Sequence, residues 1–354
     1  MRNRHEQALR ILHEGTMIPA VPLALNERRA FDERRQRALI RYYMDCGVGG
    51  IAVAVHTTQF EIRKPEIGLL EPVLRVVSEE MAAYERRTGR TLVRIAGACG
   101  PEAQAVEEAR LARKYGFDAV LLSPGGLGAL SEAQLVDRTR RVAEEMPVIG
   151  FYLQPSVGGR IFTQDYWRQI CAIPNVVAIK SAPFNRYQTL DLVRAAACSE
   201  RAEEIALYTG NDDNIVLDLL TPYRFRVDGR TVEKRFVGGL LGHWSVWTKT
   251  AVELYARLRA YQDGRPVPQE LLSLAAAVTD CNGAFFDVAN GFKGCIAGIH
   301  EVLRRQGLFE GTWCLNEEET LSPGQSGEID RVYAMYGELS DDAFVAEHLD
   351  SWLN

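Results

Sequence analysis

Two apolar patterns alternate along the chain. Short runs of β-prone apolar residues occur eight times, at 17–25, 50–56, 92–97, 119–122, 148–153, 176–180, 205–209 and 236–241. Charged segments in which apolar residues recur every three or four positions lie between them, for example 32–46, 71–87, 101–115, 131–145 and 188–197. The first pattern predicts strands and the second predicts amphipathic helices. The chain is therefore expected to repeat a strand–helix unit.

The predicted strands have the composition of a sheet that is covered on both faces. The sixth run, Val176-Val-Ala-Ile179, is apolar at every position, as parallel strands between helices are. Eight such units joined by right-handed crossovers favour a closed (β/α)8 TIM barrel, a fold of the α/β class. An open doubly wound sheet is the alternative, but the Gly-x-Gly-x-x-Gly turn that often follows its first strand is not found after residue 25.

Two segments depart from the repeat. Within 221–235, Asp228-Gly229 lies between β-prone residues, which predicts a hairpin inserted before the eighth strand. Helical patterns continue near 247–263, 267–280, 294–306 and 341–353, and no long flexible linker precedes them. We therefore predict a barrel over 1–265 and a C-terminal helical region over 266–354 that packs on it.

Composition narrows the class of protein. The chain has 354 residues, of which 47% are hydrophobic and 25% charged, as in globular proteins that bury a large core. Its net charge of −6 argues against nucleic acid or an anionic membrane as the main partner. No run approaches the roughly 18 apolar residues of a membrane helix, and the first residues lack a signal-peptide core. Seven scattered cysteines without a Cys-x-x-Cys pair are typical of reduced thiols, so we expect a cytoplasmic protein.

Polar residues at the ends of the strands are the candidates for chemistry, because barrel enzymes place their sites there. The second strand ends in His56-Thr-Thr-Gln59, whose hydroxyl and N–H groups suit a carboxylate or a proton transfer. Ordinary turn chemistry is the alternative for these threonines. The fifth strand ends near Tyr152, which is either a proton donor and acceptor or a buried phenol bonded to a loop.

The sixth strand ends in Lys180, directly after four apolar residues. Desolvation in a barrel mouth lowers the pKa of a lysine and frees the neutral amine, which attacks a ketone to form a Schiff base. A lysine that extends out of the mouth into water is the alternative. The seventh strand is followed by Gly210-Asn-Asp-Asp213. Glycine permits a close approach to a ligand, and the two acids either bind hydroxyls or cap the next helix.

Motifs for bound cofactors are missing. Gly125-Gly-Leu-Gly128 is not followed by the Lys-Ser/Thr of a phosphate-binding loop. The six histidines show no metal-ligand spacing. We therefore expect neither a metal nor an organic cofactor, and a small molecule as the only ligand.

These residues together resemble the dihydrodipicolinate synthase / N-acetylneuraminate lyase family of pyruvate-dependent class I aldolases. The resemblance extends over roughly residues 15–310. The run 50–58 is similar to a family strand that ends in Gly-Thr-Thr-Gly-Glu, and Gly210-Asn-Asp212 is similar to Gly-Asp-Asp or Gly-Tyr-Asp. Tyr152-x-x-Pro155 resembles Tyr-Asn-x-Pro, and Lys180 follows Tyr152 by 28 residues, the spacing of the family.

The resemblance implies a role for each matched residue. Lys180 would condense with the keto group of pyruvate or another 2-oxo acid. Tyr152 would relay protons with Thr57, so that Tyr152→Phe would lower turnover by about 10²-fold. Thr58 and nearby backbone amides would bind the carboxylate. The family also implies a homodimer or homotetramer.

Three departures from the family pattern point to a different second substrate. His56 replaces the first glycine of the family motif, whose second glycine and acid are also absent. Pro124-Gly-Gly126 stands where the family often has Pro-Tyr-Tyr. Val157 stands where dihydrodipicolinate synthases have an arginine, and Arg160 follows three residues later.

The sequence therefore favours a Schiff-base lyase, aldolase or dehydratase acting on a 2-oxo acid with a sugar-acid or hydroxy-acid tail. In this hypothesis Arg160 clamps a distal carboxylate, while His56, Gly210 and Asp212 also contact the substrate. A dihydrodipicolinate synthase that condenses pyruvate with aspartate semialdehyde is the alternative within enzymes. A catalytically silent barrel that only binds a keto acid is the alternative from another class.

Overall fold

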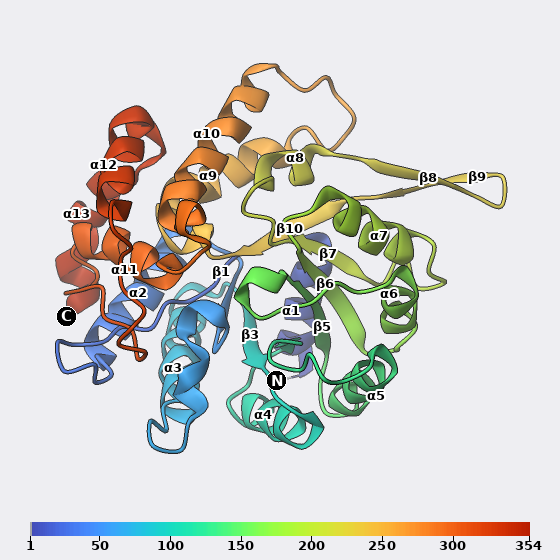
Figure 1. Ribbon diagram of the computed structural model, residues 1–354, viewed down its shortest axis with the longest axis horizontal. Coiled ribbons are helices and arrows are strands. Elements are labelled where there is room, and N and C mark those ends of the chain that lie inside the picture. Colours follow the sequence, from blue (N-terminus) through green and yellow to red (C-terminus); the bar gives the residue numbers. More distant parts are fainter. Residues whose placement is uncertain (1) are drawn as a thin grey trace.

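Eight short strands, nearly all of whose residues are buried, form the centre of the computed structural model, which describes residues 2–354 (Figure 1). They pair in parallel in the order β1-β10-β7-β6-β5-β4-β3-β2. Val21 N donates to Ala52 O at 2.8 Å, which brings the end of β1 beside β2 and nearly closes the ring. The prediction of a (β/α)8 barrel is confirmed. The strands are β1 (Met17–Pro19), β2 (Gly50–Val53), β3 (Val93–Ala98), β4 (Ala119–Leu122), β5 (Val148–Leu153), β6 (Val176–Ala182), β7 (Ala206–Thr209) and β10 (Phe236–Leu241).

Amphipathic helices surround the strands (Figure 1). Several begin at a polar cap: Ser131 and Gln134 form a reciprocal capping box at the start of α5, and Asp32 caps α2. The surrounding helices are α2 (Glu33–Cys46), α3 (Leu70–Thr88), α4 (Glu102–Lys114), α5 (Glu132–Ala143), α6 (Gln164–Cys171), α7 (Arg186–Ala197), α8 (Ile215–Leu220) and α9 (Thr248–Arg259).

The alternation of side chains along each strand divides the apolar residues into two cores. One fills the barrel and includes Ile149, Phe151 and Leu153 of β5. The other lies between the strands and the helices and includes Tyr152 of the same strand. Successive side chains of a strand point to opposite faces, so the position of a residue in the alternation decides whether it can reach the interior of the barrel.

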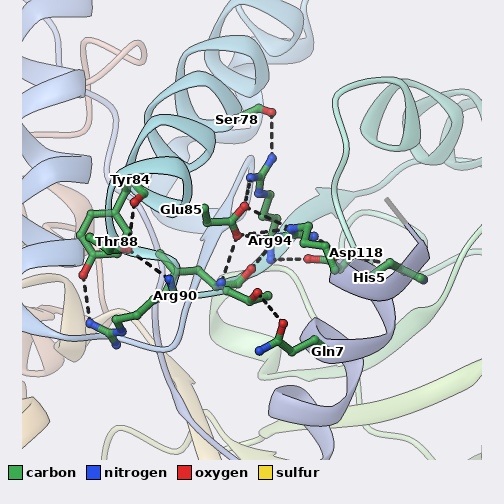
Figure 2. Close-up of polar contacts among 12 residues, drawn as sticks. His5, Gln7, Ser78, Tyr84, Glu85, Thr88, Arg90, Arg94 and Asp118 are labelled. Carbon is green, nitrogen blue, oxygen red and sulfur yellow. Dashed lines mark hydrogen bonds and ion pairs between the residues drawn. The ribbon is translucent and has the colours of Figure 1, made fainter.

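The N-terminal helix α1 (Arg2–Glu14) covers the end of the barrel opposite the site described below. Leu12 of α1 belongs to the core inside the barrel, and Tyr208 OH donates to Leu12 O at 2.7 Å. Polar contacts hold the helix in place: Arg4 of α1 donates to Glu85 Oε1 at 3.0 Å and to Leu92 O at 2.6 Å, beside the network around Glu85, Arg94 and Asp118 that Figure 2 shows. His5 of α1 contacts Asp118 at 3.0 Å. This end of the barrel is closed by structural contacts.

The predicted hairpin is present as β8 (Tyr223–Val227) and β9 (Arg230–Lys234), which pair antiparallel and project from the barrel (Figure 1). Asp228 and Gly229 have φ values of 49° and 78°, the positive values that a two-residue hairpin turn requires. The first predicted strand, 17–25, is shorter in the structure, since β1 ends at Pro19. Pro22 lacks the N–H group that a continued ladder needs.

The chain after α9 forms helices that pack against the barrel (Figure 1). They are α10 (Glu270–Phe285), α11 (Cys295–Arg305), α12 (Gln325–Met335) and α13 (Asp342–Leu353). Trp352 Nε1 donates to Asp45 Oδ2 at 2.8 Å, and Tyr42 OH donates to Asp341 Oδ2 at 2.6 Å. A domain boundary at 265 stays a prediction. Among residues 2–354, no helix combines the length and the apolar composition of a membrane-spanning segment.

Candidate active site

A pocket opens at the C-terminal end of the strands, where barrel enzymes carry their sites. The ends of six strands contribute to it, and the C-terminal region covers it with two phenylalanines and a cysteine. The lining residues are Ala20, Val55, His56, Thr57, Phe151, Leu153, Gln154, Val157, Lys180, Ala182, Phe184, Gly210, Asp212, Gly242, Phe286, Phe292 and Cys295.

Lys180 lies inside this pocket and is only 9% exposed, so it does not extend into the solvent. β6 pairs with β5 so that Lys180 lies beside Phe151, and Nζ is 4.5 Å from the centre of the Phe151 ring. Within residues 2–354, no carboxylate oxygen lies within 4.0 Å of Nζ. Burial lowers the pKa of Lys180, while the charge of Asp212 acts against that shift. A buried lysine without an ion pair is a source of neutral amine.

Asp212 places a second titratable group in the same pocket. Burial raises the pKa of its carboxyl, and the charge of Lys180 opposes that shift. Its Oδ1 is buried and has no hydrogen-bond partner among the described residues. The loop is held from α10, where Asn282 Nδ2 donates to Asp212 O at 2.6 Å and Thr279 Oγ1 donates to Asp213 O at 3.0 Å. These bonds fix the backbone of the loop, while Oδ1 of Asp212 is left without a partner among the described residues.

Gly210 brings the backbone after β7 directly against the lysine. A Cβ atom at Gly210 would lie 2.5 Å from Lys180 Cε and 2.9 Å from Ala182 Cβ. Real Cβ contacts essentially never come so close. A side chain at this position would therefore displace Lys180 or shift the backbone beside Ala182.

The turn after β2, His56–Thr58, presents both polar atoms and backbone groups. Thr57 Oγ1 donates to Ala20 O at 2.8 Å, and Thr58 Oγ1 donates to Val21 O at 2.6 Å. Thr57 lines the pocket, whereas Thr58 is fully buried and does not. The first hydrogen bond of the turn runs from Thr58 N to Val55 O, so the preceding N–H groups have no partner within it. Burial lowers the pKa of His56 to about 4, which keeps its imidazole neutral.

Tyr152 is not brought to the pocket. It is fully buried on the opposite face of β5, where its ring contacts Trp167 at a centroid distance of 5.0 Å. Its hydroxyl accepts a hydrogen bond from Phe162 N at 3.2 Å. Phe151 occupies the inward position instead, because β5 alternates without interruption and Ile149, Phe151 and Leu153 all belong to the core inside the barrel. The Tyr152 hydroxyl therefore lies outside the pocket of Lys180, away from the position that the predicted proton relay needs.

Tyr152→Phe is therefore expected to keep turnover within about threefold of wild type. Its main effect should be on stability, because the buried Phe162 N–H loses its acceptor at a cost of about 1–2 kcal/mol. Steady-state kinetics together with urea unfolding would measure both quantities. A loss of about 10²-fold in turnover with unchanged stability would restore the relay role that the resemblance implies.

Arg160 also lies away from the site. Its Nη1 donates to Leu130 O at 2.6 Å, and its guanidinium lies over the Phe162 ring at 5.5 Å. Val157 of the same loop lines the pocket. In this arrangement the Arg160 guanidinium does not line either pocket, so it does not form the expected clamp on a distal carboxylate.

An outer pocket continues from the inner one and shares Gln154, Asp212 and three phenylalanines with it. Its own polar residues are Ser156, Asn185, Gln188, Asp213, Thr279 and Asn282. Neither arginine nor lysine lines it among the described residues, and the buried Gln188 Oε1 has no hydrogen-bond partner there. The outer pocket therefore offers mainly hydrogen-bond acceptors to the part of a substrate that extends beyond Lys180.

A (β/α)8 barrel whose sixth strand carries a buried lysine, with no carboxylate within ion-pair distance in the described chain, has the nucleophile that a lysine Schiff-base enzyme needs. A family model described as the dihydrodipicolinate synthetase family matches residues 14–222, more than half of the chain, and the chain belongs to this family. Its members are class I aldolase-type enzymes that act on pyruvate, and this chain is an enzyme of that type.

Solved structures of the same fold agree with the family. Dihydrodipicolinate synthase from Oceanobacillus iheyensis is 17% identical, with a TM-score of 0.72 over 95% of this chain and 99% of that one. N-acetylneuraminate lyase from Fusobacterium nucleatum is 15% identical, with a TM-score of 0.69 over 92% and 99%. The pyruvate complex of dihydrodipicolinate synthase from Acinetobacter baumannii is 19% identical, with a TM-score of 0.72 over 91% and 99%. No curated protein matches the chain.

Proposed function

We propose that Lys180 forms a Schiff base with pyruvate or another 2-oxo acid, and that the enzyme cleaves, condenses or dehydrates a sugar acid or hydroxy acid through it. The observation that carries this proposal is the buried amine, which has no carboxylate within ion-pair distance in the described chain. Such an amine attacks C2 of the oxo acid, and loss of water gives an iminium ion. The Phe151 ring, 4.5 Å from Nζ, and the carboxyl of Asp212 favour that cation.

The carboxylate of the oxo acid is assigned to the turn after β2. The N–H groups of His56 and Thr57 precede the first hydrogen bond of this turn, and both residues line the pocket. The neutral His56 ring supplies a further donor without adding a charge. Thr58 contributes indirectly, because its bond to Val21 O holds the turn against the end of β1.

The tail of the substrate is assigned to the outer pocket. Carboxylate and amide oxygens there need donors from a ligand, and hydroxyl groups are such donors. A second carboxylate would meet Asp213 without a compensating arginine, since Arg160 is bonded to Leu130 O. This supports a hydroxylated tail over the carboxylate-bearing aspartate semialdehyde.

Aspartate semialdehyde is expected to be a poor partner for pyruvate in this enzyme. Steady-state kinetics should give a kcat/KM below about 10⁴ M⁻¹s⁻¹ for it, the lower end of the range for natural substrates. Cleavage of at least one acid from a panel of 2-oxo sugar acids should exceed that value. Arg160→Ala serves as the matched control, and it should change neither activity by more than about threefold. A semialdehyde value well above 10⁴ M⁻¹s⁻¹ would favour the synthase alternative.

Reduction with borohydride in the presence of pyruvate tests the proposed chemistry. An enzyme of this type should gain one reduced pyruvate per chain in its intact mass, and should gain none without pyruvate. A silent barrel that only binds a keto acid would show no covalent adduct with any member of a panel of 2-oxo acids.

We also propose a cytoplasmic homodimer or homotetramer. All seven cysteines are free, which supports a reducing compartment. Large apolar side chains are exposed at Ile161, Tyr187 and Leu190, as expected of a surface that a second copy covers. Light scattering that gives a monomer at micromolar concentration would contradict the assembly.

A further inference from the structure

We propose that Asp212 is the acid–base group of this enzyme, and that it takes the part which the resemblance gives to Tyr152. The proposal rests on the proposed Schiff base at Lys180. It assigns to Asp212 a catalytic role beyond the substrate contact expected from the sequence.

Other candidate groups in the pocket are poorly suited to proton transfer. Tyr152 lies on the far face of β5, and the loop after β4 carries Pro124-Gly-Gly126 in place of a tyrosine pair. The Thr57 hydroxyl already donates its proton to Ala20 O. His56 is neutral with a pKa of about 4, which makes it a weak base near neutral pH.

Asp212, in contrast, has an oxygen without a partner. Its carboxyl lines the same pocket as Lys180, and Oδ1 is buried with no hydrogen-bond partner among the described residues. A buried polar atom without a partner costs free energy until a ligand or water satisfies it. The bonds from Asn282 and Thr279 of α10 fix the backbone on either side of this carboxyl. Two independent contacts thus hold the backbone of the loop that brings Asp212 to the pocket of Lys180.

The proposed step conserves atoms and charge. The neutral amine of Lys180 adds to C2 of the oxo acid, and one of its two protons passes to the former keto oxygen, which gives a neutral carbinolamine. Protonated Asp212 then donates its proton to the carbinolamine hydroxyl, the C–O bond breaks and water leaves, while the nitrogen lone pair forms the C=N bond. The products are a cationic iminium and the Asp212 carboxylate. That carboxylate next removes a proton from C3, which gives the enamine and returns Asp212 to its acid form.

The surroundings of Asp212 favour this cycle. Burial raises its pKa, so a proton is available near neutral pH, and the iminium cation stabilises the carboxylate once the proton has left. The summed charge of the Lys180 nitrogen and the Asp212 carboxyl stays at zero throughout the cycle. This suits a pocket lined mainly by apolar side chains.

The exchange of the pyruvate methyl protons with D2O, followed by NMR, tests the proposal without the second substrate. Asp212→Asn should slow this exchange by about 10²-fold or more, and should slow the appearance of the borohydride-trapped adduct by a similar factor. Asp212→Glu keeps an acid displaced by one methylene and should recover at least tenfold over Asp212→Asn. Asp137→Asn, which removes an exposed carboxylate on α5, is the control and should behave as wild type.

The outcomes separate this proposal from the proposed function. If wild type forms no adduct, the proposed function fails. If wild type forms the adduct and a folded Asp212→Asn variant exchanges protons within about threefold of it, Asp212 is not the acid–base group, while the Schiff base stands. If the asparagine variant does not fold, Asp212→Ser replaces it, and near-native exchange in any folded variant without an acid at 212 overturns the proposal. If His56→Gln loses proton exchange while Asp212→Asn keeps the wild-type rate, the acid–base role belongs to His56 and not to Asp212.

Discussion

Lys180→Met is expected to abolish covalent chemistry while leaving the fold intact. Methionine has nearly the length of lysine and fits the apolar surroundings of Phe151 and Ala182, but it has no nucleophile. Loss of a nucleophile usually costs about 10⁴-fold or more in turnover. The melting temperature should stay the same or rise, because the variant no longer buries an amine without an ion pair.

Pyruvate proton exchange, borohydride trapping and thermal unfolding measure these effects together. Lys180→Arg provides a second test, since a guanidinium keeps the charge but cannot become a free amine at neutral pH. Both variants should lack the adduct. A trapped adduct at wild-type rate in either folded variant would show that another lysine carries the chemistry.

Gly210→Ala is expected to lower imine formation by about 10²-fold. The new methyl group would lie 2.5 Å from Lys180 Cε, so the lysine must move from its place against Phe151 and Asp212. A displacement of about 1 Å at a reacting group costs on the order of 10²-fold. The loss should fall on the rate of adduct formation, since the alanine adds no group that binds or repels the carboxylate.

Gly128→Ala is the matched control for this substitution. Gly128 lies in the loop after β4, and a Cβ there would meet no atom within 4 Å. Single-turnover trapping with pyruvate would compare the two variants, with circular dichroism to show that both are folded. Wild-type rates in Gly210→Ala would mean that the lysine reaches the substrate by another path.

The barrel could be predicted from the sequence because its signal is local and repeated. Each strand is a short apolar run and each helix an amphipathic one, and these patterns follow from burial on two faces or on one. The first strand was drawn too long because the apolar run continues past Pro22, where backbone pairing cannot. The helix α12 gave no periodic signal, as only Gln325, Ile329 and Val332 are buried along it.

The candidate site could be predicted only in part. The sequence places Lys180 and Gly210 at the pocket that they line, because each comes at the end of an apolar strand, a position that is visible in the sequence. The motif and the spacing that point to Tyr152 do not show which face of β5 it occupies, and the alternation of β5 places Ile149, Phe151 and Leu153 inside the barrel instead. One residue of register is enough to exchange the two faces of a strand.

The cover of the pocket could not be predicted at all. Phe286, Phe292 and Cys295 lie about a hundred residues beyond Lys180 and reach it only through the packing of the C-terminal helices. No periodicity or motif joins such distant segments. The same holds for Asn282, whose side-chain amide reaches the backbone of Asp212 only because α10 packs beside that loop.

Peptide mapping of the wild-type protein after borohydride reduction with pyruvate tests the central claim most directly. The protein is reduced with and without pyruvate, digested and sequenced by tandem mass spectrometry. We expect one modified lysine, Lys180, in the peptide that spans the end of β6. A reduced adduct on any other lysine, or no adduct with pyruvate and a panel of other 2-oxo acids, would contradict it.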